Sequence, residues 1–178
     1  MIQVRLHGRG GQGTVTAAEL IAVAAFYDGK YSQAFPNFGV ERRGAPVMAF
    51  ARISDHTIRL REQIYEPDYI IVQDPSLVKV EPTVLAGINN SLGILINTEI
   101  KEWPQIKCKK IVTVPATKIA MEKIGKPFIN TAVIGAFAGM SGLLSIDSIK
   151  RAITERFPEK VAVANIAAME EAFNFTKK

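Results

Sequence analysis

The sequence predicts a single α/β domain over residues 1–178, built on an open, mainly parallel sheet with helices on both faces and an inserted antiparallel hairpin. Three observations support this fold class. Short apolar runs alternate with longer segments of helical periodicity, and no repeat or long linker divides the chain. In addition, 178 residues with 48% hydrophobic content are enough to bury one sizeable core.

The strands are predicted from short apolar runs that end in polar residues or before proline. Four such runs occur, at residues 2–7, 69–73, 93–96 and 111–114. The hairpin is predicted from alternating apolar and charged positions at 46–53 and 57–61, joined by the polar turn Ser54-Asp55-His56. It places antiparallel strands within an otherwise parallel pattern.

Helices are predicted where apolar positions recur at helical spacing. Their ranges are 15–27, 75–80, 116–124, 131–140, 146–156 and 160–175. The first is so rich in Ala, Ile, Leu and Val that both of its sides are expected to be covered. The last three make the C-terminal third of the chain helical.

A glycine-rich turn between the first strand and the first helix is the main functional motif. Gly8, Gly10 and Gly13 have the G-x-G-x-x-G spacing, which allows a tight turn and close approach of the backbone to a ligand. The following helix is expected to begin near Val15, with Thr16 and Glu19 as a capping box, and its N-terminus favours a phosphate.

Other interpretations of the turn stay open. A glycine-rich turn also serves plain chain reversal, and the absence of a Lys-Ser/Thr ending makes a Walker A nucleotide loop a poor match. Asp28 lies near the ribose-binding position of a dinucleotide fold, which keeps nicotinamide dinucleotide binding as an alternative. Asp28-Gly29-Lys30 fits a turn after the helix equally well.

A second motif is the loop of residues 34–46. Its adjacent Arg42 and Arg43 offer two guanidinium groups to phosphate or carboxylate, and Glu41 is placed to orient one of them. Phe35 and Phe38 flank these charges, which favours an interface over a solvated charge pair on a free surface.

Composition narrows the classes of function. The formal net charge of +5 suits an acidic ligand or partner, but the basic residues are scattered, so we expect no nucleic acid partner. No apolar run is long enough to span a membrane and no signal-peptide pattern precedes the first strand, so we expect a cytoplasmic protein. The single cysteine, Cys108, cannot alone hold an iron-sulfur cluster or a structural zinc ion.

No catalytic residue is predicted. His7 ends a buried strand and is interpreted as a core residue, His56 is expected to be exposed at the hairpin tip, and no Ser-His-Asp set is apparent. We predict no metal ligands either.

The two motifs together resemble a known family. HGRGGQG at residues 7–13 and FGVERRGAP at 38–46 are similar to the gamma subunits of the 2-oxoacid:ferredoxin oxidoreductases, most closely of the pyruvate type. The resemblance continues through Glu66-Pro67-Asp68, Asn130-Thr131 and Gly135-Ala136, and so covers nearly the whole chain.

This resemblance implies one subunit of a complex that converts pyruvate or a related 2-oxo acid, CoA and oxidised ferredoxin to an acyl-CoA and CO2, or runs the reverse. It implies alpha, beta and delta subunits as partners, with thiamine diphosphate, Mg2+ and iron-sulfur clusters on those partners only. The isolated chain is expected to be inactive, and its apolar loop around Phe35 and Phe38 suggests a homodimer when it is alone.

The family resemblance also implies a contact with coenzyme A beside the thiamine cofactor. Main-chain N–H groups of the glycine-rich turn would bind CoA phosphates, two arginines would neutralise them, and one asparagine would add a polar contact or simply cap its helix. The residues so assigned are Gly10, Gly11, Gln12, Gly13, Thr14, Arg42, Arg43 and Asn130. A stand-alone nicotinamide-dependent dehydrogenase and a purely structural subunit are the competing hypotheses.

Overall fold

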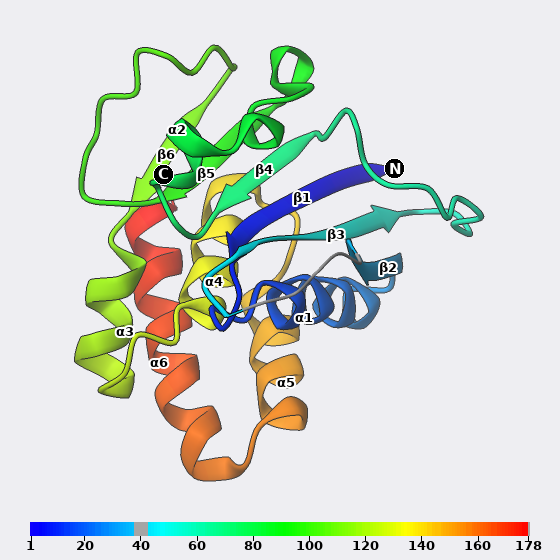
Figure 1. Ribbon diagram of the computed structural model, residues 1–178. Coiled ribbons are helices and arrows are strands. Elements are labelled where there is room, and N and C mark those ends of the chain that lie inside the picture. Colours follow the sequence, from blue (N-terminus) through cyan, green and yellow to red (C-terminus); the bar gives the residue numbers. More distant parts are fainter. Residues whose placement is uncertain (38–42, 178) are drawn as a thin grey trace.

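The computed structural model describes residues 1–37 and 43–177, in which six strands form one sheet. Figure 1 shows the arrangement of its elements. Its strands are β1 (Ile2–Arg9), β2 (Tyr31–Pro36), β3 (Pro46–Ser54), β4 (Tyr69–Val72), β5 (Gly93–Asn97) and β6 (Ile111–Val114). The order across the sheet is β2-β3-β1-β4-β5-β6. Strands β1, β4, β5 and β6 run parallel, whereas β3 is antiparallel to both β1 and β2. The predicted fold class is confirmed.

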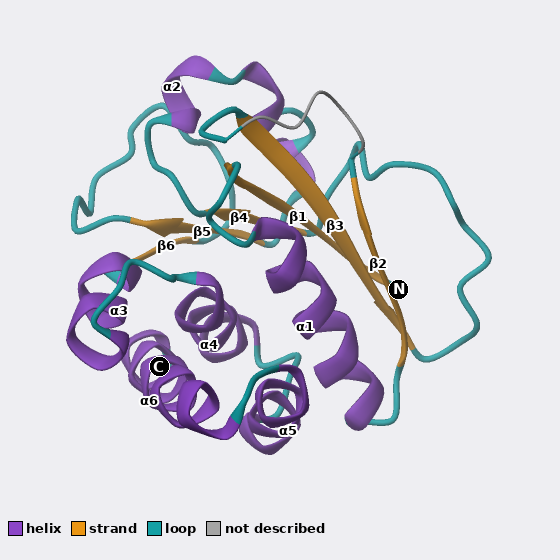
Figure 2. Cartoon of the chain, turned by 60° about the horizontal axis from the view of Figure 1, so that its bottom comes forward, coloured by secondary structure: helices purple, strands orange, loops and turns teal. Residues whose placement is uncertain are grey.

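The helices are distributed unequally over the two faces of the sheet. They are α1 (Thr14–Tyr27), α2 (Leu77–Val80), α3 (Ala116–Ile124), α4 (Asn130–Ser141), α5 (Ile146–Arg156) and α6 (Glu159–Thr176). Figure 2 shows α1 and α3 to α6 together on one face, while the short α2 lies on the other. Within the described residues, no helix is long and apolar enough to cross a membrane.

The alternation of side chains along the strands divides the core into two clusters. On β4, Ile71 faces the layer of long helices, whereas Ile70 and Val72 face α2. On β5, Leu95 faces the long helices. Helix α1 is covered on one side by β2 and β3 and on another by α5, with Val23 and Phe26 left exposed, so the expected covering of both its sides is largely confirmed.

The predicted hairpin is wrong in its second strand. Residues 57–61 form no strand, and β3 pairs instead with β2, whose residues 34–36 are predicted to lie in a loop. Two interactions explain the difference. The Phe35 and Phe50 rings pack at 5.0 Å between centroids across β2 and β3. The buried Arg52 guanidinium donates hydrogen bonds to the carbonyls of Leu60 and Glu62. These carbonyls are therefore occupied by a side chain and not by a neighbouring strand.

Arg5 and His7 form a buried pair on β1, on the face of the sheet that carries α2. The Arg5 side chain donates to His7 Nε2 at 3.0 Å and to four main-chain carbonyls, two in residues 64–65 and two in residues 84–86. Burial lowers the pKa of Arg5 to about 10, so it stays charged at neutral pH. Burial and the nearby Arg5 charge lower the pKa of His7 to about 3. His7 is therefore a neutral acceptor, and its predicted place in the core is confirmed.

We expect the free energy of unfolding to fall as the pH is lowered from about 6.5 towards 3 because of His7. Its pKa is lower in the folded chain than the usual 6.5, so the unfolded chain binds the extra proton in this range. One such group contributes a slope of up to about 1.4 kcal/mol per pH unit. Urea denaturation at a series of pH values measures this slope.

The matched control is His7→Gln, because glutamine offers Arg5 an acceptor and does not titrate. The difference in slope between the two proteins isolates the histidine from the carboxylates. Equal slopes for wild type and His7→Gln between pH 4 and 6.5 would contradict the prediction.

Candidate functional site

The candidate site lies where the connections of two adjacent parallel strands leave the sheet in opposite directions. Strand β1 leads into α1 on the face of the long helices, and its neighbour β4 leads into α2 on the opposite face (Figure 2). In open α/β sheets, ligands bind at such a switch point beside the carboxyl ends of the strands. The glycine-rich turn is located there, directly after β1.

The turn itself leaves main-chain donors open. Gly11 and Gly13 have φ values of 97° and 72°, a region that glycine adopts without strain. Gly13 is the N-cap of α1 and makes no side-chain cap, so the capping box predicted at Thr16 and Glu19 is wrong. The helix begins at Thr14, so its first N–H groups have no acceptor within the helix.

Two of the five predicted main-chain donors are used within the protein. The N–H of Gly10 donates to Ala45 O at 2.9 Å, and that of Gln12 donates to Arg9 O at 3.0 Å. The N–H groups of Gly11, Gly13 and Thr14 have no acceptor among the described residues. The donors that remain open to an anion are therefore these three.

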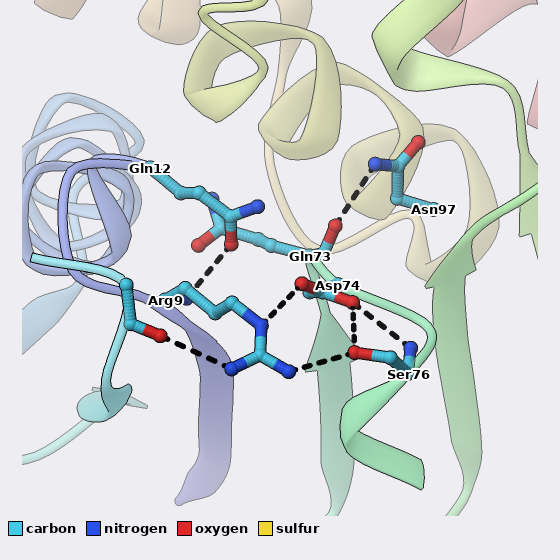
Figure 3. A network of polar contacts seen from close by, with 7 residues as sticks. Arg9, Gln12, Gln73, Asp74, Ser76 and Asn97 are labelled. Atoms are coloured by element: carbon cyan, nitrogen blue, oxygen red, sulfur yellow. Dashed lines mark hydrogen bonds and ion pairs between the residues drawn. The ribbon is translucent and has the colours of Figure 1, made fainter. Parts of the chain in front are cut away.

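Arg9 connects three segments around the turn (Figure 3). Its guanidinium donates to Asp74 Oδ2 at 2.6 Å, Ser76 Oγ at 2.8 Å and Gly44 O at 3.1 Å. Partial burial acts to raise the pKa of Asp74, but hydrogen bonds from Ser76 and Arg9 outweigh it and hold this pKa below its usual value. Asp74 is thus an anion neutralised by Arg9, and the pair fixes the turn to the start of α2.

Gly8 allows side chains from three segments to approach the end of β1. A Cβ at this position would lie 2.2 Å from Thr14 Oγ1, 2.5 Å from Gln73 Oε1 and 3.2 Å from Gln12 Oε1. The Thr14 hydroxyl donates to Gln73 Oε1 at 2.6 Å, and Asn97 Nδ2 donates to Gln73 O at 2.9 Å. Only a glycine leaves room for this arrangement.

Asn130 brings a second helix N-terminus to the turn. It is the first residue of α4, and its Nδ2 lies 3.1 Å from the position of a Cβ on Gly13. The N-cap residue of α4, Ile129, makes no side-chain cap, and Asn130 Oδ1 accepts the N–H of Thr131 at 3.1 Å. The positive ends of the α1 and α4 dipoles therefore meet at Gly13, where both favour an anion.

The arginine loop ends beside the glycine-rich turn. Gly44 N donates to Gly10 O at 3.1 Å, so the arginine loop and the glycine-rich turn are joined by a main-chain hydrogen bond. Arg43 is exposed in the turn before β3. Arg42, together with Phe38, Gly39, Val40 and Glu41, lies outside the described residues. A pocket of about 310 Å3 opens on this side of the turn, lined by Arg9, Gly10, Gly11, Gly13, Thr14, Val15, Thr16 and Val47.

Other residues considered as functional have structural partners. The Asp28 carboxylate accepts from Ser145 N at 2.8 Å and from the hydroxyls of Ser145 and Ser148 at 2.6 Å. Burial acts to raise the pKa of Asp28, yet these hydrogen bonds outweigh it and lower the pKa. Because the 14 residues of α1 span about 21 Å, Asp28 is remote from the glycine-rich turn and anchors α5. His56 is exposed after β3, as predicted.

Sequence reasoning missed four residues of the site: Arg9, Gln73, Asp74 and Ser76. The available signal was their position at the carboxyl edge of the sheet, since Arg9 ends β1 and the other three lie within four residues after β4. The described residues contain no group of three or more His, Cys, Asp or Glu side chains placed to hold a metal ion.

The fold and the site define an open α/β domain with a glycine-rich turn, rich in open N–H donors, at its switch point. The model of the pyruvate ferredoxin/flavodoxin oxidoreductase family matches residues 3–175, and the chain belongs to this family. The resemblance stated from the two motifs is confirmed.

Two curated relatives match almost end to end. Pyruvate synthase subunit PorC of Methanocaldococcus jannaschii is 53% identical, with 98% of this chain and 96% of the relative covered. The pyruvate/ketoisovalerate oxidoreductases common subunit gamma of Thermococcus kodakarensis is 50% identical, with 99% and 97% covered. The homologues are thus subunits of a multisubunit oxidoreductase.

Two solved structures share the fold. Pyruvate oxidoreductase subunit PORC from Thermotoga maritima is 32% identical with a TM-score of 0.81, covering 97% of this chain and 95% of that chain. The 2-oxoglutarate:ferredoxin oxidoreductase from Magnetococcus marinus gives a TM-score of 0.79 at 17% identity, covering 98% of this chain and 31% of the other. The latter likeness concerns the fold alone.

Proposed function

We propose that this chain is the gamma subunit of an oxidoreductase complex that acts on pyruvate or a related 2-oxo acid, and that its glycine-rich turn holds coenzyme A. The complex would form acyl-CoA and CO2 with reduction of ferredoxin, or run the reverse reaction. The names of the relatives support the subunit assignment. One relative is named as a subunit common to pyruvate and ketoisovalerate oxidoreductases, so the proposed substrate class includes both pyruvate and branched-chain 2-oxo acids.

The observation that carries the CoA assignment is the convergence of two helix N-termini on one glycine-rich turn. The open N–H groups of Gly11, Gly13 and Thr14 and the amide of Asn130 suit the oxygens of a diphosphate or a 3′-phosphate. Arg43 adds an exposed positive charge nearby, since the next residue, Gly44, is hydrogen-bonded to the turn. The fold relative from Magnetococcus marinus was solved with coenzyme A and succinyl-CoA bound, which favours the same class of ligand.

Within the complex, the role we propose for this chain is to position CoA and exclude water. Holding the phosphates orients the thiol towards the acyl group on the partner subunits and converts a bimolecular capture into an oriented one. Closure of the site against water protects the intermediate from hydrolysis. We assign thiamine diphosphate, Mg2+ and iron-sulfur clusters to the alpha, beta and delta partners. A lone cysteine cannot hold a cluster, which accords with this assignment.

Removal of the two loop arginines tests the proposal. In the assembled complex, Arg42→Ala combined with Arg43→Ala is expected to raise KM for CoA by roughly 10- to 100-fold while kcat at saturating CoA changes little. The reason is that lost charge-assisted contacts to phosphate weaken binding of CoA alone. Steady-state kinetics of dye reduction with pyruvate and CoA, under anaerobic conditions, measures both constants.

Arg59→Ala provides the matched control, because Arg59 is an exposed arginine of another loop. If the double variant keeps the wild-type KM for CoA, the purely structural role replaces our proposal. Micromolar binding of NAD to the wild-type chain without binding of CoA to the complex would support the dehydrogenase instead.

A further inference from the structure

The Gln73 carboxamide is half satisfied at the centre of the candidate site. Gln73 directly follows β4 and is fully buried. Its Oε1 accepts the Thr14 hydroxyl, but Nε2 is a buried donor with no hydrogen-bond partner among the described residues. Leaving a buried N–H unpaired is unfavourable, so such a group in a ligand site indicates an acceptor supplied from outside.

Gln12 occupies the adjacent position with an internal acceptor. Its Oε1 accepts the main-chain N–H of Arg9 at 2.7 Å, at the carboxyl end of β1. The Gln12 and Gln73 carboxamide oxygens both lie beside the space that Gly8 leaves open, 3.2 Å and 2.5 Å from the position of a Cβ there. Figure 3 shows the two carboxamides at the end of β1, next to the Arg9 network.

Arg9 itself is not free to serve an anion with its charge. Its guanidinium is committed to Asp74, Ser76 and Gly44. Its main-chain N–H is held only by the Gln12 side chain, which is partly exposed and can rotate away without breaking the fold. The Arg9 N–H is thus held by Gln12, and the half-satisfied Gln73 carboxamide lies beside the same space at Gly8.

We propose that Gln73 is a further ligand-binding residue of the CoA site and that Gln12 covers it in the free protein. In this inference, which rests on the proposed function, the Gln12 oxygen substitutes for a phosphate oxygen. CoA binding displaces it, and the Arg9 N–H and Gln73 Nε2 then donate to oxygens of the CoA diphosphate. Displacing Gln12 lowers the apparent affinity, because only the fraction of molecules with Gln12 turned away binds CoA.

The test uses isothermal titration of CoA into the complete complex, purified without oxygen. Gln12→Ala removes the cover and is expected to bind CoA about 3- to 10-fold more tightly than wild type, the effect of one neutral hydrogen bond. Gln73→Glu keeps an oxygen for Thr14 but replaces the donor by an acceptor, and is expected to bind CoA at least about 10-fold more weakly. If the Gln73→Glu complex does not assemble, Gln73→Met serves instead, because methionine lacks the donor and adds no acidic group. It is also expected to weaken CoA binding.

Gln63→Glu is the matched control, since it makes the same chemical change in an exposed loop outside the turn, and wild-type affinity is expected. Weaker CoA binding by Gln12→Ala would show that Gln12 is itself a ligand and would overturn the inference. Wild-type affinity in both Gln73 variants would also overturn it. If the Arg42/Arg43 double variant still weakens CoA binding in those cases, the proposed function survives; if that variant has no effect either, both fail.

Discussion

Gly135→Ala is expected to lower the free energy of unfolding by about 3 kcal/mol or more, the largest effect on stability that we predict. Gly135 lies on α4 where it crosses α6, and both helices pack beneath the sheet (Figure 2). A Cβ at this position would lie 2.0 Å from the carbonyl oxygen of Met169 and 2.8 Å from its carbonyl carbon. Because these are main-chain atoms of a helix, no side-chain rotation relieves the overlap, and α6 must move as a whole.

The measurement is urea denaturation followed by far-UV circular dichroism, with Gly142→Ala as the control. Gly142 ends the same helix at φ 68°, and a Cβ there meets no atom within 4 Å. Only the cost of a left-handed alanine applies, about 1 to 2 kcal/mol. If Gly135→Ala costs no more than Gly142→Ala, α4 and α6 do not cross as closely as described.

Gly8→Ala is expected to weaken CoA binding by about 100-fold or more in the assembled complex. The added Cβ would lie 2.2 Å from Thr14 Oγ1 and 2.5 Å from Gln73 Oε1. Both atoms belong to the candidate site and are hydrogen-bonded to each other, so the methyl group must break this bond and push the Thr14 and Gln73 side chains out of their positions. A displacement that costs about 3 kcal/mol in the binding-competent arrangement corresponds to roughly 100-fold in affinity.

Gly11→Ala is the control within the same turn. Its φ is 97° and a Cβ there meets nothing within 4 Å. Alanine at this position therefore costs only the backbone strain of a positive φ, about 1 to 2 kcal/mol, and the main-chain N–H is retained. Titration of CoA into each variant complex compares the two. Equal affinities for wild type and Gly8→Ala would contradict the proposed site.

The helices were predicted closely because their signals are local. The range 116–124 agrees with α3 at both ends, and 146–156 agrees with α5, whose Ser145 accepts the N–H of Ser148 as a cap. Strand β2 was not predicted because its residues are only partly buried and show little alternation. Its place in the sheet depends on pairing with β3, a segment that is separate from it in the sequence.

The candidate site divides in the same way. The glycine spacing predicted the turn and its open donors, and the paired arginines pointed to an anion. Gln73 and Asp74 carry no motif, since their importance comes only from following β4, which lies beside β1 through a pairing of distant segments. The use of the Gly10 and Gln12 N–H groups inside the protein was equally invisible in the sequence.

By itself, the sequence determined the class of fold, most helix limits, the family and the place of the glycine-rich turn, because these depend on periodicity, glycine conformations and short motifs. Only the tertiary structure decided which strand completes the sheet beside β3, that the α1 and α4 N-termini meet at Gly13, and that Gln12 lies beside a half-satisfied Gln73. The reason is physical: strand pairing, close approach and desolvation of polar groups arise between residues far apart in the chain, and no local pattern encodes their distance.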